Sequence, residues 1–408
     1  MKKILCLMII LCLALSAALA EGKEINGGEV RNIQINPAGE NPVEEGVSPT
    51  TGRNLAEVAA EAPEGAAGLA VTGRYMPIMV QIQNTKQGIG SYAPLYGACA
   101  DVVYQTSLAY NGLDRMSFIF SDVIPEIGGF VRSTRVTHLR IRQEWDSAYV
   151  TSGWSNADVQ GELQTLGIPD PTESTTEAVT YFNENPGLIY VAGLPSRPWG
   201  SYYRRMIGGN SPAAPNNEAF ELAALVNDLV PADYVPKSHA FRFTDEKPEG
   251  EDANFIYVQM TSSEDSYSEL QYDEETNTYF RYLYKNGTPV AYQENIPVNL
   301  QKTKDADGEK RFQISKLELG REIDFANVIV QSVEYEWIDF ERPIPTMVGT
   351  GNADYFMGGK HIAGVWQRDD VNSRTVFYGE DGNEIELQRG RTLIILLDWQ
   401  NTGHVKYE

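Results

Sequence analysis

Hydrophobic positions along this chain fall into short runs, and in the first half these runs alternate with candidate helices. Four runs between residues 76 and 151 are almost wholly apolar and rich in β-branched or aromatic side chains, as is typical of strands covered on both faces. Strands that alternate with helices predict an α/β layer over residues 74–239. The expected strands are 76–82, 101–108, 116–120 and 148–151, and the expected helices are 133–145, with Ser133 as N-cap, 156–166 and 217–229.

The second half has a different pattern, in which strand-like runs follow one another without helices between them. Turn dipeptides separate several runs, among them Asn286-Gly287, Asp307-Gly308 and Asp381-Gly382. The pattern predicts a mostly antiparallel β domain over residues 240–408, and the fold class expected for the whole chain is therefore α+β. The expected strands here are 255–260, 269–272, 279–284, 328–335, 361–366, 374–378, 384–387 and 392–397.

Residues 1–20 have the pattern of a secretory signal peptide. Two lysines precede an apolar run over 4–15, and a small-x-small cleavage site ends at Ala20. An uncleaved anchor helix is the alternative, but the apolar run is short for a membrane span and polar residues follow at once. Neither Cys6 nor Cys12 follows a small residue, so a lipid anchor is not expected. We expect a secreted, extracellular or cell-envelope-associated protein.

Residues 21–73 are rich in Glu, Gly, Ala, Pro and Asn. Such a composition buries too little apolar surface to offset the entropy of the chain, so this segment is expected to be a flexible tether with a short helix at 54–61. No later stretch reaches the ~18 consecutive apolar residues of a membrane-spanning helix. The mature chain is therefore expected to have no transmembrane span.

Composition and charge narrow the function classes. The 408 residues are 42% hydrophobic and 22% charged, which is ordinary for a globular protein. A net charge of −23 argues against a nucleic acid partner, because a phosphate backbone needs a basic face. The four histidines have no metal-ligand spacing and no Gly-rich phosphate loop is present, so no metal and no cofactor is expected. Cys99, the one cysteine after the signal peptide, is expected to be a buried hydrophobe rather than a nucleophile.

Arginines are concentrated in one short stretch of this acidic chain. Arg132, Arg135, Arg140 and Arg142 fall within eleven residues, and Arg115 precedes them at the start of an expected strand. Guanidinium groups bind carboxylates or phosphates in a bidentate way, and the start of a helix also favours anions. The pattern predicts an anion pocket at the start of this helix. The alternative is a set of structural ion pairs with the many Asp and Glu side chains.

A family resemblance enters at the same stretch. Residues 125–135, PEIGGFVRSTR, are similar to a signature of the YerB-like lipoproteins of the bacterial envelope. The resemblance implies an envelope protein with two domains, both of unknown function. Further segments follow the family pattern in order, namely Thr51-Gly52, residues 100–104, Leu113-Asp114-Arg115, Gly349-Thr350-Gly351, Gly364-Val365-Trp366 and Gly390-Arg391-Thr392.

The chain also departs from the family pattern at three titratable positions. Gln83, Gln105 and Asn216 stand where the resemblance leads us to expect Asp, Glu and His. An acid/base catalyst needs a group that exchanges a proton near the working pH, so amides at these positions favour loss of any such chemistry. The arginines remain, and anion binding needs only them.

We therefore expect a non-enzymatic protein that binds an anionic envelope component or an envelope protein. One alternative is a hydrolase or transferase acting on a cell-wall glycan, peptide or phosphodiester, with Asp101 or Asp146 as base. Another is a structural scaffold whose arginines pair internally. The expected ligand-binding residues are Arg115, Arg132 and Arg135, supported by Ser133, Asp101 and Asn84.

Overall fold

The computed structural model describes most of the chain after the expected signal peptide at 1–20, which lies outside the described residues. None of the helices in the described part combines the length and the apolar character needed to cross a bilayer. The described residues are 22–25, 27–84, 90–109, 114–154, 157–184, 188–237, 239–261, 266–285, 287–338, 342–401 and 403–408.

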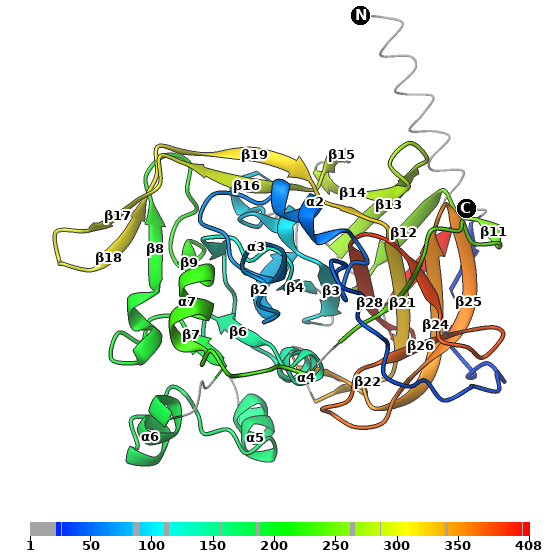
Figure 1. Cartoon of the computed structure of the whole chain (residues 1–408), viewed down its shortest axis with the longest axis horizontal. Coiled ribbons are helices and arrows are strands. Elements are labelled where there is room, and N and C mark those ends of the chain that lie inside the picture. Colours follow the sequence, from blue (N-terminus) through cyan, green and yellow to red (C-terminus); the bar gives the residue numbers. More distant parts are fainter. Residues whose placement is uncertain are drawn as a thin grey trace, which may run out of the picture.

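One mixed sheet of eleven strands runs through both halves of the molecule (Figure 1). The halves join where β28 pairs in parallel with β3, with Thr392 opposite Val102 and Leu396 opposite Thr106. In order across the sheet the strands are β11 (Glu251–Asp252), β25 (Lys360–Arg368), β24 (Gly349–Met357), β21 (Asn327–Val333), β28 (Thr392–Asp398), β3 (Val102–Ser107), β4 (Asp114–Phe120), β2 (Ile78–Asn84), β6 (Ala148–Thr151) and β7 (Ile189–Val191), with β26 (Val376–Gly379) beside β25.

The first half has the expected layer of strands and helices. Strands β3, β4 and β2 are antiparallel, and β6 and β7 extend the sheet in parallel from β2. The prediction that Ser133 caps the following helix is wrong, because the N-cap is Arg135, whose backbone N–H donates to Nδ1 of His138 at 3.0 Å. The helices are α2 (Leu55–Ala60), α3 (Leu69–Thr72), α4 (Val136–Trp145), α5 (Ala157–Thr165), α6 (Thr176–Glu184) and α7 (Leu222–Leu229), with 3-10 turns at Gly90–Tyr92, Gly97–Cys99 and Pro198–Ser201.

The second half is mostly antiparallel, as expected. Its own sheet has seven strands, and every pairing within that sheet is antiparallel. These strands are β1 (Lys23–Glu24), β29 (His404–Tyr407), β12 (Phe255–Gln259), β13 (Tyr267–Asp273), β14 (Thr278–Lys285) and β15 (Thr288–Ala291), with β20 (Asp324–Phe325) beside β14. Two small sheets complete this half, the parallel pair β10 (Arg242–Thr244) with β27 (Glu386–Gln388) and the antiparallel pair β22 (Tyr335–Trp337) with β23 (Pro343–Pro345).

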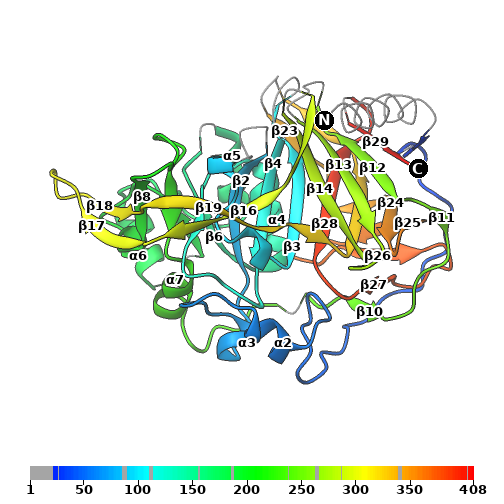
Figure 2. The same ribbon diagram turned by 90° about the horizontal axis from the view of Figure 1, so that it is seen from above.

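A long arm that the sequence did not predict links the halves. Strands β16 (Gln293–Val298) and β19 (Lys316–Glu322) leave the second half and cross the molecule, as Figures 1 and 2 show. The hairpin β17 (Gln301–Lys304) and β18 (Lys310–Gln313) at its end pairs in parallel with β8 (Tyr203–Ile207). A five-stranded sheet results, which β9 (Glu218–Phe220) and β5 (Gly128–Gly129) complete.

The segment before the first domain is ordered rather than flexible over its described residues. In its first half, β1 pairs with β29 and Arg31 pairs with Asp354 at 2.8 Å. Ser48 Oγ and Thr51 Oγ1 donate to the carboxylate of Asp122 at 2.8 and 2.9 Å. Helix α2 follows with Asn54 as its N-cap, which matches the short helix expected there. The prediction of a flexible tether over 21–73 is therefore wrong for the described residues, because strand pairing and hydrogen bonds to buried groups fix a segment whose composition buries little apolar surface.

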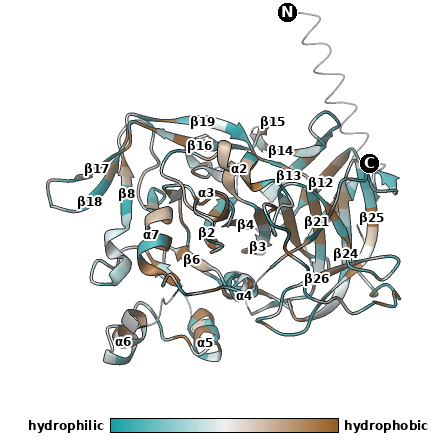
Figure 3. Cartoon of the chain, viewed as in Figure 1, coloured by the Kyte–Doolittle hydropathy of each residue, from teal (hydrophilic) through white to brown (hydrophobic). Residues whose placement is uncertain are grey.

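The hydrophobic core continues across both halves. Buried apolar side chains of β2, β3 and β4 belong to the same cluster as those of β21 and β28. Figure 3 shows hydrophobic residues gathered in these central strands, whereas hydrophilic residues prevail on β19 and the outer loops. The two domains thus share a sheet and a core, which holds the start of α4 in a fixed position against β2 and β4.

Candidate functional site

Arg115 is the most buried of the three predicted arginines. It lies on β4 opposite Gln83 of β2 and Thr106 of β3, and it is 8% exposed. Its Nη1 donates to the backbone oxygen of Ser133 at 2.7 Å, while its Nε is buried without a hydrogen-bond partner. The guanidinium therefore reaches the backbone just before α4 with hydrogen-bonding capacity left over.

Arg132 lies in the extended segment that leads to α4. Its backbone N–H donates to the backbone oxygen of Gln81 at 2.8 Å, which anchors the segment to β2. Its Nη2 contacts two amide oxygens, Oε1 of Gln83 and Oδ1 of Asn216. Two of the three amides that stand at expected acid or base positions therefore meet at one arginine.

Ser133 and Arg135 complete the group at the start of α4. Ser133 Oγ donates to the backbone oxygen of Ser152 at 3.3 Å, and Arg135 Nη1 donates to that of Thr134 at 2.9 Å. Both residues, like Arg132, are partly exposed. Four of the six predicted residues are thus brought together, one buried and three accessible.

The group carries positive charge, which the carboxylate of Glu218 offsets in part at Arg132. Within the described part of the chain, neither Arg115 nor Arg132 forms an ion pair with a carboxylate. Burial, and then the charges of Arg135 and Arg132, lower the pKa of Arg115 to about 9. Burial and the charges of Arg115 and Arg135 also lower the pKa of His138, which keeps that imidazole neutral at physiological pH.

Three other arginines, one in the same stretch and two later in the chain, follow the structural alternative. Arg140 on α4 pairs with Glu162 at 2.9 Å. Arg204 pairs with Glu221 at 2.8 Å, and Arg205 lies 3.4 Å from Glu218. Arg142 instead donates from Nε to the backbone oxygen of Ser147 at 3.0 Å. The structure therefore separates these supporting arginines from the group at the start of α4.

Asn84 is separated from this group by the sheet. Successive side chains of a strand point to opposite faces, so Asn84 and Asp114 lie on the face opposite to Gln83 and Arg115. Asn84 Nδ2 and Gln105 Nε2 both donate to Oδ2 of Asp114 at 2.5 Å, and Asn84 Oδ1 accepts from Arg281 of β14 at 2.8 Å. Asn84 thus belongs to a buried polar contact between the domains.

Asp101 lies at the other end of β3. It lies five positions before Thr106, the partner of Arg115, which at ~3.3 Å per residue places it about 16 Å away. Its Oδ2 accepts from the backbone N–H of Ser121 at 2.5 Å and that of Asp122 at 2.9 Å. Burial and the charge of Asp122 raise the pKa of Asp101 well above its usual value. Asp101 therefore supports a turn and does not face the arginines.

Asp146, the other expected base, ends helix α4 at the far side from the arginines. Its Oδ1 accepts from the hydroxyl of Tyr234 at 2.8 Å, and its Oδ2 from the backbone N–H of Lys237 at 3.1 Å. It has a left-handed backbone conformation, with φ of 45°. This arrangement is typical of a helix C-cap rather than of a base beside a bound substrate.

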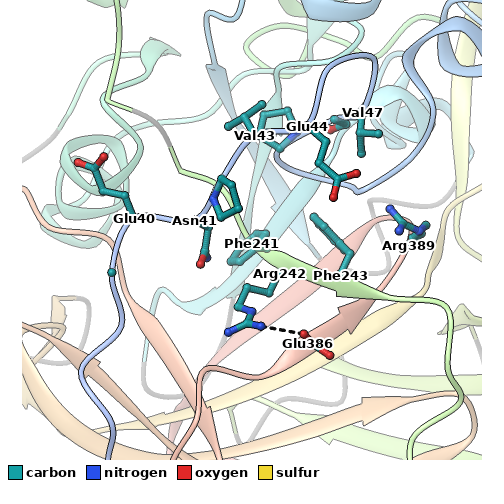
Figure 4. A pocket seen from close by; sticks show the side chains of 14 residues that line it. Glu40, Asn41, Val43, Glu44, Val47, Phe241, Arg242, Phe243, Glu386 and Arg389 are labelled. Atoms are coloured by element: carbon teal, nitrogen blue, oxygen red, sulfur yellow. Dashed lines mark hydrogen bonds and ion pairs between the residues drawn. The ribbon is translucent and has the colours of Figure 1, made fainter.

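Two open pockets lie elsewhere, and sequence reasoning did not find them. One, of about 460 Å³, has Phe241 and Phe243 against the coil over 39–49, with Arg242 paired to Glu386 at 3.0 Å (Figure 4). A second, of about 680 Å³, is lined by arginines from both ends of the chain, each paired to a carboxylate. Those arginines are Arg53, Arg321, Arg389 and Arg391. Only the folded chain brings Arg53 to the other three, so no local pattern could have indicated this pocket.

Comparisons with known proteins agree with the motifs. Residues 67–187 match the model of the N-terminal domain of DUF3048, a protein of unknown function, and residues 256–394 match its C-terminal domain. The chain belongs to this two-domain family. The signature over 125–135 lies in the first match, as does every residue of the group at the start of α4.

A crystal structure of another protein has a similar fold. The crystal structure of the YerB protein from Bacillus subtilis is similar to this chain with a TM-score of 0.57 at 18% sequence identity. The alignment covers 88% of this chain and 99% of that chain. No curated protein sequence matches the chain. The resemblance to YerB-like proteins is confirmed, and at this identity the structural likeness shows the fold.

Proposed function

We propose that this protein is an exported, non-enzymatic binding protein that holds an anionic component of the bacterial envelope, or an acidic envelope protein, at Arg115, Arg132 and Arg135. The observation that carries the proposal is the charge of Arg115. Its guanidinium is 8% exposed, close enough to two other arginines for their charges to lower its pKa, and without a carboxylate partner among the described residues.

Energetics favour an external anion at this place. A buried charge is costly when it is neither paired nor fully hydrogen-bonded, and like charges nearby add to that cost. A phosphate or carboxylate group would accept from the guanidinium forks and offset the mutual repulsion. Arg132 and Arg135 are partly exposed, so such a ligand can reach the group from solvent.

The surrounding amides support binding rather than catalysis. Gln83 and Asn216 accept from Arg132 through neutral oxygens, so they leave its positive charge in place. They also exchange no proton near neutral pH, unlike the Asp and His expected there from the family resemblance. Asp101 and Asp146, the bases of the enzymatic alternative, lie away from the arginines.

Titration calorimetry of the mature chain with inorganic diphosphate tests the proposal. We expect the protein to bind diphosphate and Arg132→Gln to bind at least about tenfold more weakly, since loss of one charge-assisted contact is worth about 1.5 kcal/mol or more. Arg140→Gln is the matched control, because Arg140 lies on the helix that follows Arg132 but is paired to Glu162. Equal affinity of all three proteins would overturn the proposal.

Two longer probes distinguish the source of the anion. A glycerol-phosphate oligomer represents a phosphate-bearing envelope polymer, and a polyglutamate peptide represents an acidic protein. If the site is assigned correctly, Arg132→Gln lowers the affinity for whichever of the two probes the wild-type chain binds. Export is tested separately by sequencing the N-terminus of the secreted form, which is expected to begin at Glu21.

A further inference from the structure

The outer face of the seven-stranded sheet carries a separate pocket. Strands β12, β13 and β14 lie side by side at the surface, and no described helix crosses them in Figure 2. The pocket has a volume of about 350 Å³. It shares no residue with the group at the start of α4. Its lining residues are Glu24, Tyr257, Gln259, Tyr267, His404 and Lys406.

Strand register arranges these six side chains in two rows. In the first row Lys406 of β29 lies directly opposite Glu24 on one side and Tyr257 on the other. In the second row Gln259 of β12 lies directly opposite both His404 and Tyr267. Directly opposite residues on one face of a sheet have Cβ atoms about 5 Å apart, so each row is a continuous strip of side chains.

Hydrogen bonds hold the aromatic part of this surface. The Tyr257 hydroxyl donates to Oε1 of Glu408 at 3.1 Å. Tyr267 packs against Tyr284 with ring centroids 5.0 Å apart, and the Tyr284 hydroxyl donates to Oε2 of the fully buried Glu269 at 2.5 Å. Fixed rings lose little conformational entropy when a ligand binds, so the tyrosines form a preorganised wall.

The pocket lining has one carboxylate, Glu24, and one ammonium, Lys406, and the carboxylates of Glu269 and Glu408 lie close to its tyrosines. The carboxylate of Glu24 faces the ammonium of Lys406 across the paired strands and accepts from Nδ1 of His404 at 3.0 Å. An anion would be repelled by Glu24, Glu269 and Glu408, and a cation would be repelled by Lys406, so a ligand without net charge suits this lining. The side chains nevertheless offer hydrogen-bond acceptors and donors within one small area. Glu24 accepts, Lys406 donates, and the amide of Gln259 does both.

From this combination we infer that the pocket binds a neutral saccharide. A sugar ring has apolar C–H faces that pack on fixed aromatic rings, and its hydroxyls both donate and accept hydrogen bonds without net charge. The volume lies in the range of small-molecule sites and accommodates a short oligosaccharide. Tyr267 supplies the packing surface, and Gln259, Lys406 and Glu24 hold the hydroxyls.

Saturation-transfer NMR with the mature chain tests this inference, with maltose and N,N′-diacetylchitobiose as probes at about 10 mM, a concentration suited to weak sites. We expect transfer to at least one disaccharide, and its reduction by more than half in Tyr267→Ala and in Gln259→Ala. Tyr202→Ala is the matched control, because Tyr202 is a partly exposed tyrosine outside the pocket, on the far domain. Circular dichroism confirms that each variant is folded.

The outcome is separable from that of the anion site. Arg132→Gln is expected to leave the saccharide signal unchanged, and Tyr267→Ala to leave diphosphate binding unchanged. Absence of transfer to both disaccharides would refute the inference. Transfer to a disaccharide that persists in Tyr267→Ala and Gln259→Ala would refute it as well. A lysine-rich peptide serves as a cationic probe, and transfer to that peptide but to neither disaccharide would also refute the inference.

Discussion

Glu144 of α4 and Arg368 of β25 form an ion pair of 3.0 Å whose side chains are 1% and 0% exposed. The same guanidinium donates from Nη2 to the backbone oxygen of Arg140 at 3.0 Å, and Glu144 also accepts from the backbone N–H of Thr375 at 2.9 Å. The helix that begins at the arginine group is therefore fixed to the second domain at its other end.

Removal of one partner of this pair is expected to be strongly destabilising. Arg368→Ala leaves a buried carboxylate without its charge partner, which costs about 3–5 kcal/mol in the free energy of unfolding. The double variant Glu144→Gln with Arg368→Met removes both charges and is expected to lose less. Urea unfolding followed by far-UV circular dichroism measures both, and a double variant less stable than Arg368→Ala would contradict this expectation.

The pair also predicts a loss of stability in acid. Burial alone would raise the pKa of Glu144, but Arg368, His239 and the N–H of Thr375 together lower it to about 2. A depressed carboxyl pKa contributes stability that is present above the unfolded value of about 4.3 and is lost as pH falls toward 2. The melting temperature is expected to fall less steeply with pH in Glu144→Gln than in the wild type across this range.

Asp114 predicts the opposite dependence near neutral pH. Burial raises its pKa to about 7, against the lowering effects of Arg281, Gln105 and Asn84. The folded protein then holds a proton that the unfolded chain releases above about pH 4, so the contribution of this carboxyl to stability falls as pH rises through 7. In Asp114→Asn the difference in urea midpoint between about pH 5 and about pH 8 is expected to shrink, and an unchanged difference would be evidence against this pKa.

Gln83 provides a nearly isosteric test of the arginine group. Gln83→Glu replaces the amide oxygen that accepts from Arg132 by a carboxylate, which neutralises part of the positive charge. Diphosphate affinity is expected to drop by about tenfold, while the thermal stability stays the same or rises. A carboxylate introduced at the distant Gln367→Glu, an exposed partner of Asp369, is the control and should leave affinity unchanged.

Asp122 is predicted to hold the segment before the first domain. Asp122→Ala removes the acceptor of the Ser48 and Thr51 hydroxyls, and a buried donor without a partner costs about 1–3 kcal/mol. Trypsin is expected to cleave after Arg53 faster in this variant than in the wild type. Asp170→Ala is the matched control, because the Asp170 side chain bonds to Gln160 and Thr172 rather than to this segment, and equal cleavage rates would show that other contacts hold the segment.

The positions of strands were predictable where the residues of the strand alone show that it is buried. The apolar runs at 116–120 and 392–397 became β4 and β28, because continuous burial on both faces is encoded in the run itself. The arm formed by β16 and β19 was not predictable in the same way. Its residues are largely polar, and its strands exist because they pair with each other and, through β18, with β8.

Only the part of the candidate site that consists of neighbours in the chain was predictable from the sequence. Arg132, Ser133 and Arg135 are neighbours in the chain, so any fold with a helix after them keeps them together. Asn84 follows Gln83 directly, yet the period of two along a strand sends it to the other face of the sheet. Asp101 directly precedes the strand that holds Thr106, the partner of Arg115, and lies about 16 Å away at the far end of that strand.

By itself the sequence determined the fold class, most of the strands, the family and the accumulation of arginines before α4, since all of these depend on residues close together in the chain. Only the tertiary structure decided which arginines meet a carboxylate. Arg140 forms an ion pair with Glu162 and Arg368 forms one with Glu144, whereas Arg132 donates hydrogen bonds to two amide oxygens. Pairing over long sequence separations depends on where packing brings each side chain, and composition does not encode that choice.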